Sequence, residues 1–160
     1  MTREAFVRDL YRGREIEVNI VSALKDKFPA TTLIDGKFKD YDAFIPEISK
    51  KLEIKMDEVS LRTGRIVIEL EMFGKPSGLL STKADDWVIY TGKQYLWIKP
   101  SKIFECILLN GLKTSTIVGN GDSNPKTICF IQNDLFKKYC HTIQDVLNIE
   151  EVYNNIGERR

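Results

Sequence analysis

Apolar and polar residues alternate most clearly over residues 65–73, RIVIELEMF. The isoleucine, leucine and methionine positions of this segment fall on one face, and Glu69 and Glu71 fall on the other. Successive side chains of a strand point to opposite faces of a sheet. The alternation therefore predicts a strand with one face in the core and one polar face.

A different period marks the N-terminal part of the chain, where residues 2–27 predict a helix. Apolar side chains recur there at near-helical spacing: Phe6, Leu10, Ile16, Ile20, Val21 and Leu24. Gly13 interrupts the pattern, and we expect it to separate a short leading turn from the main helix. Pro29 marks the end of the helix, because proline cannot continue it.

Shorter patterns predict the remaining elements. Further strands are expected at residues 31–34, 42–45, 51–56, 87–90, 95–98, 114–118 and 127–131. Further helices are expected at residues 82–86, 100–109, 134–139 and 143–146. Ser81 is expected to cap the first of these helices. With no internal repeat and no obvious linker, the pattern predicts one mixed α/β domain over residues 1–160.

Composition narrows the class of protein. The 160 residues are 42% apolar and 29% charged, as in soluble globular proteins. The net charge of +1 counts mildly against a nucleic-acid binder but leaves DNA binding open. Three cysteines without close spacing favour reduced thiols over disulfides or a zinc site. No apolar run approaches the ~20 residues that cross a bilayer, and the N-terminus has no signal-peptide core, so we expect a cytoplasmic protein with no membrane partner.

Residues 41–57, YDAFIPEISKKLEIKMD, carry the candidate chemistry. Asp42 lies on one short apolar segment, and Glu53 and Lys55 lie two apart on the next. Residues two apart on a strand share a face, so Glu53, Lys55 and Asp57 are expected on one side. The intervening side chains are expected to face the core: Leu52, Ile54 and Met56. Carboxylates that converge beside a lysine suit a hard divalent cation, which activates water and stabilises charge on a phosphate.

A Gly-x-x-x-Glu stretch precedes this segment, at Gly13 and Glu17 in GREIEVNIVSAL. A helix with that stretch, a strand with Asp42 in KDYDAF, and a strand with Glu53 and Lys55 in LEIK together resemble the PD-(D/E)XK nuclease superfamily. The helix is most similar to that of archaeal-type Holliday junction resolvases. The later segment KPSGLLSTKADDWVIY is similar to one in small phage and viral nucleases of the same superfamily.

The resemblance covers residues 10–100 and implies a fold. It implies a restriction-endonuclease-like αβββαβ core, with a central mixed sheet flanked by helices. Residues 101–160 would then be a C-terminal elaboration. Tyr41 replaces the proline of the family's motif, at a position that varies widely within the superfamily.

The resemblance also implies roles for single residues. Asp42, Glu53 and the backbone carbonyl of Ile54 would bind Mg²⁺ or Mn²⁺, and Glu17 would reach the metal directly or through a water. Lys55 would orient or help deprotonate the attacking water and offset charge on the phosphate. Mg²⁺ commonly takes only one or two protein carboxylates and keeps several waters, which agrees with this small set.

Other residues near the motif are further candidates for the site, and each has an ordinary surface role as its alternative. Glu69, on the polar face of its strand, is a possible additional acid of the site, and Asp57 is a possible support for Lys55. Lys83, in STKADDW, is a possible phosphate contact, and its alternative is a plain surface lysine. Basic residues near the motif are candidate DNA contacts: Lys51, Arg62, Arg65 and Lys83.

The sequence therefore predicts a Mg²⁺-dependent endonuclease that hydrolyses DNA phosphodiester bonds. A junction resolvase is the first expectation, and it requires a homodimer because two symmetric cuts need two active sites. A restriction-like or homing endonuclease is the first alternative, with residues 119–125 as a base-reading loop. A catalytically silent DNA-binding or assembly subunit with the same fold is the second. If the source is a phage or virus, the expected location is the host cytoplasm.

Overall fold

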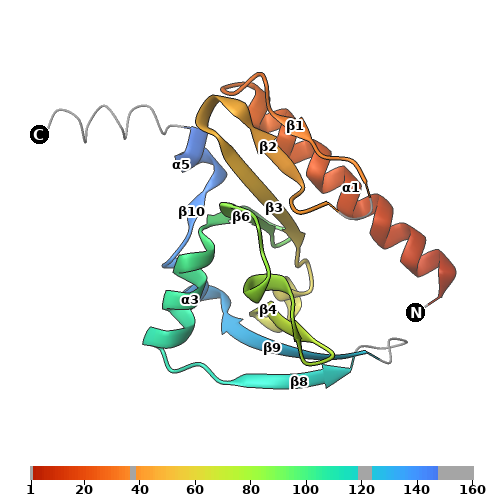
Figure 1. Ribbon diagram of the computed structural model, residues 1–160, viewed down its shortest axis with the longest axis vertical. Helices are drawn as coiled ribbons and strands as arrows, with labels where there is room; N and C mark the ends of the chain where they lie inside the picture. The colour runs from red at the N-terminus through yellow and green to blue at the C-terminus, as the bar shows by residue number, and fades with distance from the viewer. Residues whose placement is uncertain (1, 37–38, 119–123, 148–160) are drawn as a thin grey trace, which may run out of the picture.

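A mixed six-stranded sheet lies at the centre of the computed structural model, which describes residues 2–36, 39–118 and 124–147. Helix α1 (Arg3–Lys25) packs across one face of this sheet, and a second, four-stranded sheet packs against the other (Figure 1). The prediction of a mixed α/β fold is confirmed.

Strand order defines the two sheets. The first has the order β1 (Thr32–Leu33), β2 (Ala43–Ile45), β3 (Lys50–Met56), β6 (Asp86–Tyr90), β7 (Tyr95–Ile98) and β10 (His141–Thr142). All its neighbours are antiparallel except β3 and β6, which run parallel. The second, fully antiparallel sheet has the order β5 (Lys75–Pro76), β4 (Arg65–Met72), β9 (Pro125–Gln132) and β8 (Thr114–Val118).

Short helices complete the described part of the chain. The α-helices are α2 (Ser60–Thr63), α3 (Pro100–Leu109), α4 (Asn133–Lys137) and α5 (Ile143–Leu147). Two 3-10 helices are η1 (Pro46–Ile48) and η2 (Gly78–Leu80). α3 begins and ends at the predicted residues, and β6 and β7 form the predicted hairpin.

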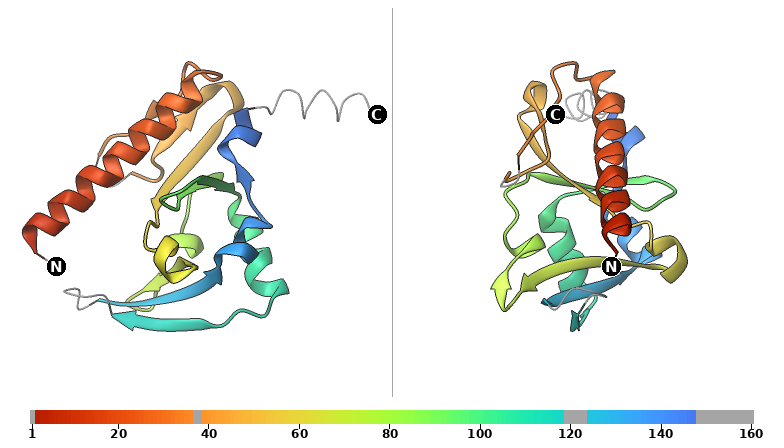
Figure 2. Two further views of the ribbon diagram at one scale, coloured as in Figure 1. Left: turned by 180° about the vertical axis from the view of Figure 1, so that it is seen from behind. Right: turned by 90° about the vertical axis from the view of Figure 1, so that its right-hand side faces the viewer.

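The predicted break of the first helix is wrong. α1 runs without interruption through Gly13, and its start is capped by the Thr2 hydroxyl, which accepts a hydrogen bond from the N–H of Ala5 at 3.1 Å. A glycine costs a helix interior only about 1 kcal/mol relative to alanine. Burial of four residues in the C-terminal half outweighs that cost: Ile16, Ile20, Val21 and Leu24. The N-terminal half extends past the sheet, so Phe6 stays exposed (Figures 1 and 2).

The predicted helix over residues 82–86 is also wrong. The Asp85 backbone N–H donates to the carbonyl of Lys51 at 2.8 Å, and Asp86 then enters β6. The Thr82 hydroxyl accepts hydrogen bonds from the N–H of Ala84 and from the Trp87 indole. These bonds tie the segment to β3 and to its own turn, so its backbone groups are satisfied without a helix. Ser81 follows η2 instead of capping a helix.

Met56 departs from its predicted burial. Leu52 and Ile54 are buried against α1 as expected, but Met56 is 37% exposed. It is the last residue of β3, paired with Tyr90 at the end of β6. The buried residues of α1 begin only at Ile16, and at this end of the sheet α1 presents Arg12, which lies over the Tyr90 ring and pairs with Glu58.

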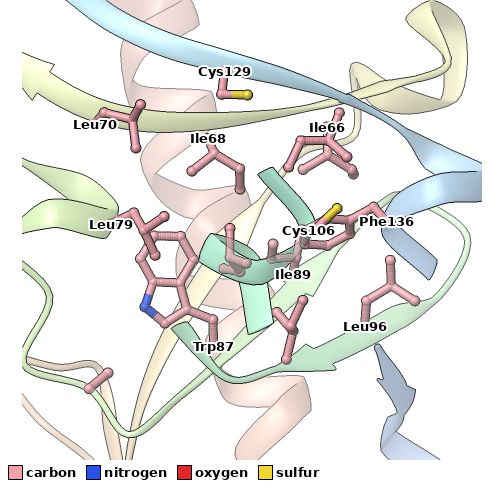
Figure 3. Close-up of a cluster of buried hydrophobic side chains, with 14 residues drawn as sticks. Ile66, Ile68, Leu70, Leu79, Trp87, Ile89, Leu96, Cys106, Cys129 and Phe136 are labelled. Carbon is pink, nitrogen blue, oxygen red and sulfur yellow. The ribbon is translucent and has the colours of Figure 1, made fainter. Parts of the chain in front are cut away.

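Two hydrophobic clusters hold the layers together. The first joins α1 to one face of the six-stranded sheet through Ile20, Leu24, Leu52 and Val88, among others. The second joins the opposite face of that sheet to β4, β9, α3 and α4. Figure 3 shows its side chains converging from both sheets, with these labelled: Ile66, Ile68, Leu70, Leu79, Trp87, Ile89, Leu96, Cys106, Cys129 and Phe136.

Two strands of the second sheet, β4 and β5, come from the connection between the parallel strands, and β8 and β9 come from the chain after α3. From β3 to β6 the chain passes through α2, β4, β5 and η2. The only α-helix in this connection is α2, with four residues. Most of the loop 119–125, a candidate base-reading element, lies outside the described residues, as do residues 148–160 of the C-terminal elaboration. None of the described helices has both the length and the apolar character that crossing a membrane requires.

Gly78 fits η2 against β4 with no space for a side chain. Its φ of +50° belongs to the left-handed region, and a Cβ there would collide with the Glu69 carbonyl oxygen. Gly74, with φ of +73°, has open space around the same position. We expect Gly78→Ala to lower the free energy of unfolding by about 3 kcal/mol, since it combines strain with a clash, and Gly74→Ala by about 1 kcal/mol. Urea unfolding of both variants tests this, and equal losses would contradict it.

Candidate functional site

Asp42 is fixed beside Glu53 by two hydrogen bonds to β3. Its backbone N–H donates to the carbonyl of Leu52 at 2.8 Å, and its Oδ2 accepts the backbone N–H of Ile54 at 2.7 Å. These bonds flank Glu53 on either side. The Asp42 side chain is only 6% exposed, so its position is closely defined. The role expected for the Ile54 carbonyl stays a prediction, since it is the N–H of that residue that contacts Asp42.

Glu53 and Lys55 lie on the same face of β3. The Lys55 Nζ is 3.2 Å from the Glu53 Oε1 and 5.4 Å from the centre of the Trp87 ring. Trp87 is paired with Glu53 across the parallel β3–β6 ladder. The half-exposed Lys55 ammonium is therefore held between a carboxylate and an aromatic face.

Burial raises the pKa of Glu53, and the charge of Asp42 raises it further. The charge and hydrogen bond of Lys55 act in the opposite direction, as does the more distant charge of Lys39. Burial outweighs these cations, so the carboxyl is easier to protonate than an ordinary glutamate. Two acids so close together favour a cation between them.

Glu17 approaches the same acids from α1 through Lys39. The Lys39 Nζ lies 3.0 Å from the Asp42 Oδ1 and 3.7 Å from the Glu17 Oε1. Arg14 holds the other side of Glu17, with its Nη1 3.3 Å from the Glu17 Oε2. Glu17 of α1 and Asp42 thus both face the ammonium group of Lys39.

Lys39 was not among the predicted site residues. Burial lowers its pKa, but the hydrogen bond and charge of Asp42, with the charge of Glu17, outweigh burial and leave the pKa raised. The sequence signal for its role is its position three residues before Asp42, because the chain that leads into a strand can fold back and bring the two side chains together. Several lysines surround the motif, and the sequence did not distinguish this one from the others.

Two hollows meet at Lys55 and form one groove, called here the Lys55 groove. The first has a volume of about 270 Å³ and the second about 370 Å³. Both are lined by Lys55, Gly78 and Trp87. Glu53 and Lys83 line the first, and the second continues between β3 and β4. The groove therefore runs along the boundary between the two sheets, past the Glu53–Lys55 pair.

Asp57 and Glu69 line the second hollow. The Asp57 Oδ2 accepts the backbone N–H of Val67 at 3.0 Å, which ties the end of β3 to β4. Burial raises the pKa of Asp57, and its backbone hydrogen bonds to Val67 and Ser60 oppose that rise. Glu69 pairs with Lys126 of β9 at 3.4 Å. Both acids face the groove but lie on the far side of Lys55 from Asp42.

The four candidate DNA contacts are placed differently. Lys83 is exposed at the mouth of the first hollow and has no ion pair within the described residues. Lys51 shares the face of Glu53 on β3, with its Nζ 5.7 Å above the Tyr41 ring. Arg65 stacks on Phe130 at 4.0 Å in the second sheet, and neither it nor Arg62 lines the groove.

The carboxylates do not form a closed cluster. Within residues 2–36, 39–118 and 124–147, no three carboxylate, thiol or imidazole side chains converge as a ready metal-binding group. The ammonium of Lys39 stands between Asp42 and Glu17, and that of Lys55 is against Glu53. Each of these acids thus has a lysine beside it, and no lysine stands between Asp42 and Glu53 within the described residues.

Comparison with family models, with curated proteins and with solved structures gave no match for this chain. A functional assignment therefore depends on the residues and their geometry.

The raised pKa of Glu53 gives a direct test of this geometry. Removing Lys55 removes a cation that lowers that pKa, so in Lys55→Gln the carboxyl should titrate at higher pH than in the wild type. Lys51→Gln is the matched control, because Lys51 is on the same strand and face without contributing to the shift. Carboxyl ¹³C shifts of Glu53 followed by NMR from acid to neutral pH measure both.

The direction in which Glu53 changes the free energy of unfolding with pH follows from the same pKa shift. A folded-state pKa above the unfolded one means that the contribution of Glu53 to stability is full at low pH and is lost as pH rises through the folded pKa. In Lys55→Gln the pKa of Glu53 is higher still, so the stabilising contribution of Glu53 should persist to a higher pH before it is lost. An unchanged Glu53 titration in Lys55→Gln would contradict the pairing.

Proposed function

We propose that this chain is a Mg²⁺-dependent endonuclease that hydrolyses DNA phosphodiester bonds. The observation that carries the proposal is the arrangement of Asp42, just before β2, beside Glu53 and Lys55 of β3, which line the Lys55 groove. Oxygen ligands beside a lysine, in an open groove that a phosphate backbone can enter, suit metal-assisted phosphodiester hydrolysis better than other hydrolytic chemistry.

The strand order supports membership of the PD-(D/E)XK superfamily. β1, β2 and β3 form an antiparallel meander, β6 adds parallel to β3, and α1 covers one face. This matches an αβββ unit followed by a parallel strand. The helix that the αβββαβ core requires before its last strand is reduced to the four residues of α2, beside two inserted strands. The proposal therefore includes a modified crossover.

The residues present fit a divalent cation. Asp42 and Glu53 would supply carboxylate oxygens as metal ligands from adjoining segments of the chain. Glu17 would add a third carboxylate once Lys39 moves aside. Mg²⁺ needs only one or two protein carboxylates. Bound there, Mg²⁺ or Mn²⁺ supplies Lewis-acid activation of the phosphate and of water.

The chain's own residues would divide the remaining work. Lys55 holds the attacking water against Glu53 and offsets the charge that develops on the phosphate. Lys83, which has no ion pair in the described part of the chain and lies at the mouth of the groove, would contact a neighbouring phosphate, as would Lys51. The acids keep the groove from binding DNA too tightly in the absence of a metal, because they repel the backbone.

Substrate geometry is the finer part of the proposal. A junction resolvase is the form we favour, with a homodimer that presents two grooves about a twofold axis. A restriction-like or homing endonuclease is the competing form. Cleavage of four-way, flap, duplex and single-stranded DNA separates them, because only the resolvase cuts the four-way junction in preference to intact duplex.

Replacing the central pair tests the catalytic assignment. Glu53→Ala and Lys55→Ala should each reduce Mg²⁺-dependent cleavage at least ~100-fold, because each removes a group that acts in the transition state. Glu71→Ala and Lys75→Ala are matched controls on β4 and β5, away from the groove lining, and should cleave like the wild type. Full activity in both central variants would show that the site lies elsewhere.

One observation favours a second candidate, a catalytically silent DNA-binding subunit. Lys39 already supplies a cation to Asp42 and Glu17, so a metal ion would have to displace it. For an endonuclease, Lys39→Met should tighten Mn²⁺ binding several-fold in calorimetry, since a competing positive charge is removed. Lys51→Met, which leaves those acids paired, should not. Absence of Mn²⁺ binding in both the wild type and Lys39→Met would favour the silent subunit.

A further inference from the structure

β8 forms one edge of the second sheet, and no strand of the described residues pairs with its outer side. In Figure 1 and in the left view of Figure 2 it runs along the lower border of the molecule. Its side chains are exposed except for that of Ile117, which is half-buried. An edge strand offers unpaired backbone N–H and C=O groups to another strand. Nothing in the proposed nuclease chemistry uses this edge.

The other sheet edges within residues 2–36, 39–118 and 124–147 are protected in ways that β8 is not. β1 and β10, which end the first sheet, have two residues each. β5, at the other end of the second sheet, also has two, and they are Lys75 and Pro76. Short strands, lysine and proline are common ways to block an edge. β8 has five residues, TSTIV, with no charge and no proline, so its edge is open to a further strand.

Large apolar side chains are exposed at both ends of β8. Leu108 and Leu109, at the end of α3, are 76% and 70% exposed, and Val118, at the end of β8, is 61% exposed. Thr114 pairs with Cys129 of the core, so Thr114 and Val118 lie on the face of the sheet on which α3 packs. Within one chain, the leucines and the valine are thus on one face but at opposite ends of the strand.

A second copy of β8, antiparallel about a twofold axis, brings these two groups together. Residues directly opposite in an antiparallel pair have their side chains on the same face. With Thr116 on the axis, Thr114 of one copy is opposite Val118 of the other. Thr114 follows Leu109 by five residues, so the exposed valine of each copy comes to the end of α3 in the other.

We propose that β8 pairs with itself in a homodimer centred on Thr116, which joins two four-stranded sheets into one continuous sheet. A different partner would have to bring its own apolar groups for both ends of the strand, whereas a second copy already has them. Antiparallel pairing about a twofold axis is also the self-complementary contact that a closed dimer requires.

This inference names the interface of the homodimer in the proposed function, and it rests on that proposal only for the use of two grooves. The pairing itself depends on β8 and α3. Five paired residues are few beside the ~1,200 Å² or more that a stable interface buries, so the exposed leucines should carry a large share of the affinity.

Sedimentation equilibrium of the full chain tests the interface without DNA. The wild type should be dimeric at ~100 µM chain. Thr116→Lys places two ammonium groups opposite each other and should weaken the dimer at least ~10-fold, as should the two carboxylates of Thr116→Glu. An equimolar mixture of these variants should recover the dimer, because the mixed pair has opposite charges. Thr32→Lys, on the exposed edge strand β1, is the matched control and should dimerise like the wild type.

A double variant, Leu108→Ser with Leu109→Ser, tests the apolar contact. It should weaken the dimer at least ~10-fold, because the valine of the other copy then meets polar side chains. Both leucines are on the surface, so this variant keeps the test decisive even if a change within β8 disturbs the strand.

Four results would overturn the proposal. They are a monomeric wild type, which would leave β8 to a different partner, a dimer that survives both Thr116→Lys and the leucine double variant, a dimer lost in Thr32→Lys, and no recovery in the mixture. A monomer that still cleaves DNA would overturn this interface alone. A dimer that responds to these variants as expected but cleaves no DNA would support the interface and overturn the proposed function.

Discussion

β3 is hydrogen-bonded along both edges, antiparallel to β2 and parallel to β6, and this double pairing positions both cores and the candidate site. Because side chains alternate along a strand, the pairing decides that Leu52 and Ile54 meet α1 while Glu53 and Lys55 face the second sheet. Asp42 completes the pairing beyond the end of β2, since its carboxylate accepts the N–H of Ile54. A shift of one residue in register would exchange the two faces and bury the charged pair beneath α1.

The charges that this pairing brings together stabilise one another in turn. Carboxylates that are largely removed from solvent are costly unless they are paired. Lys39 satisfies that requirement for Asp42 and Glu17, and Lys55 for Glu53. The same pairing keeps the acids close enough to attract a divalent cation. One arrangement thus stabilises the fold without a metal and also positions the acids to bind one. A metal ion would take the place of a lysine ammonium group.

The errors in the sequence-based prediction share a physical cause. Residues 82–86 were expected to form a helix, but the Asp85 N–H donates to the Lys51 carbonyl and the Ala84 N–H donates to the Thr82 hydroxyl in another conformation. Met56 fits the alternation of β3, yet at that end of the sheet α1 places the charged Arg12 over Tyr90 in place of an apolar side chain. Gly13 was expected to interrupt the first helix, but the buried residues that follow it keep the helix continuous. In each case a contact between segments distant in sequence overrode a local preference.

The sequence by itself determined every described strand except β5 and β10 and most of the helices, because alternation and spacing are local properties that burial then enforces. It also determined the positions of Asp42 just before β2 and of Glu53 and Lys55 on β3. Only the tertiary structure decided that Lys39 stands between Asp42 and Glu17, and that the buried Asp86 accepts the indole N–H of Trp97. Pairing of charges and the satisfaction of buried atoms depend on which distant segments meet. The candidate nuclease residues were therefore visible along the chain, whereas their electrostatic partners appeared only once the sheet had formed.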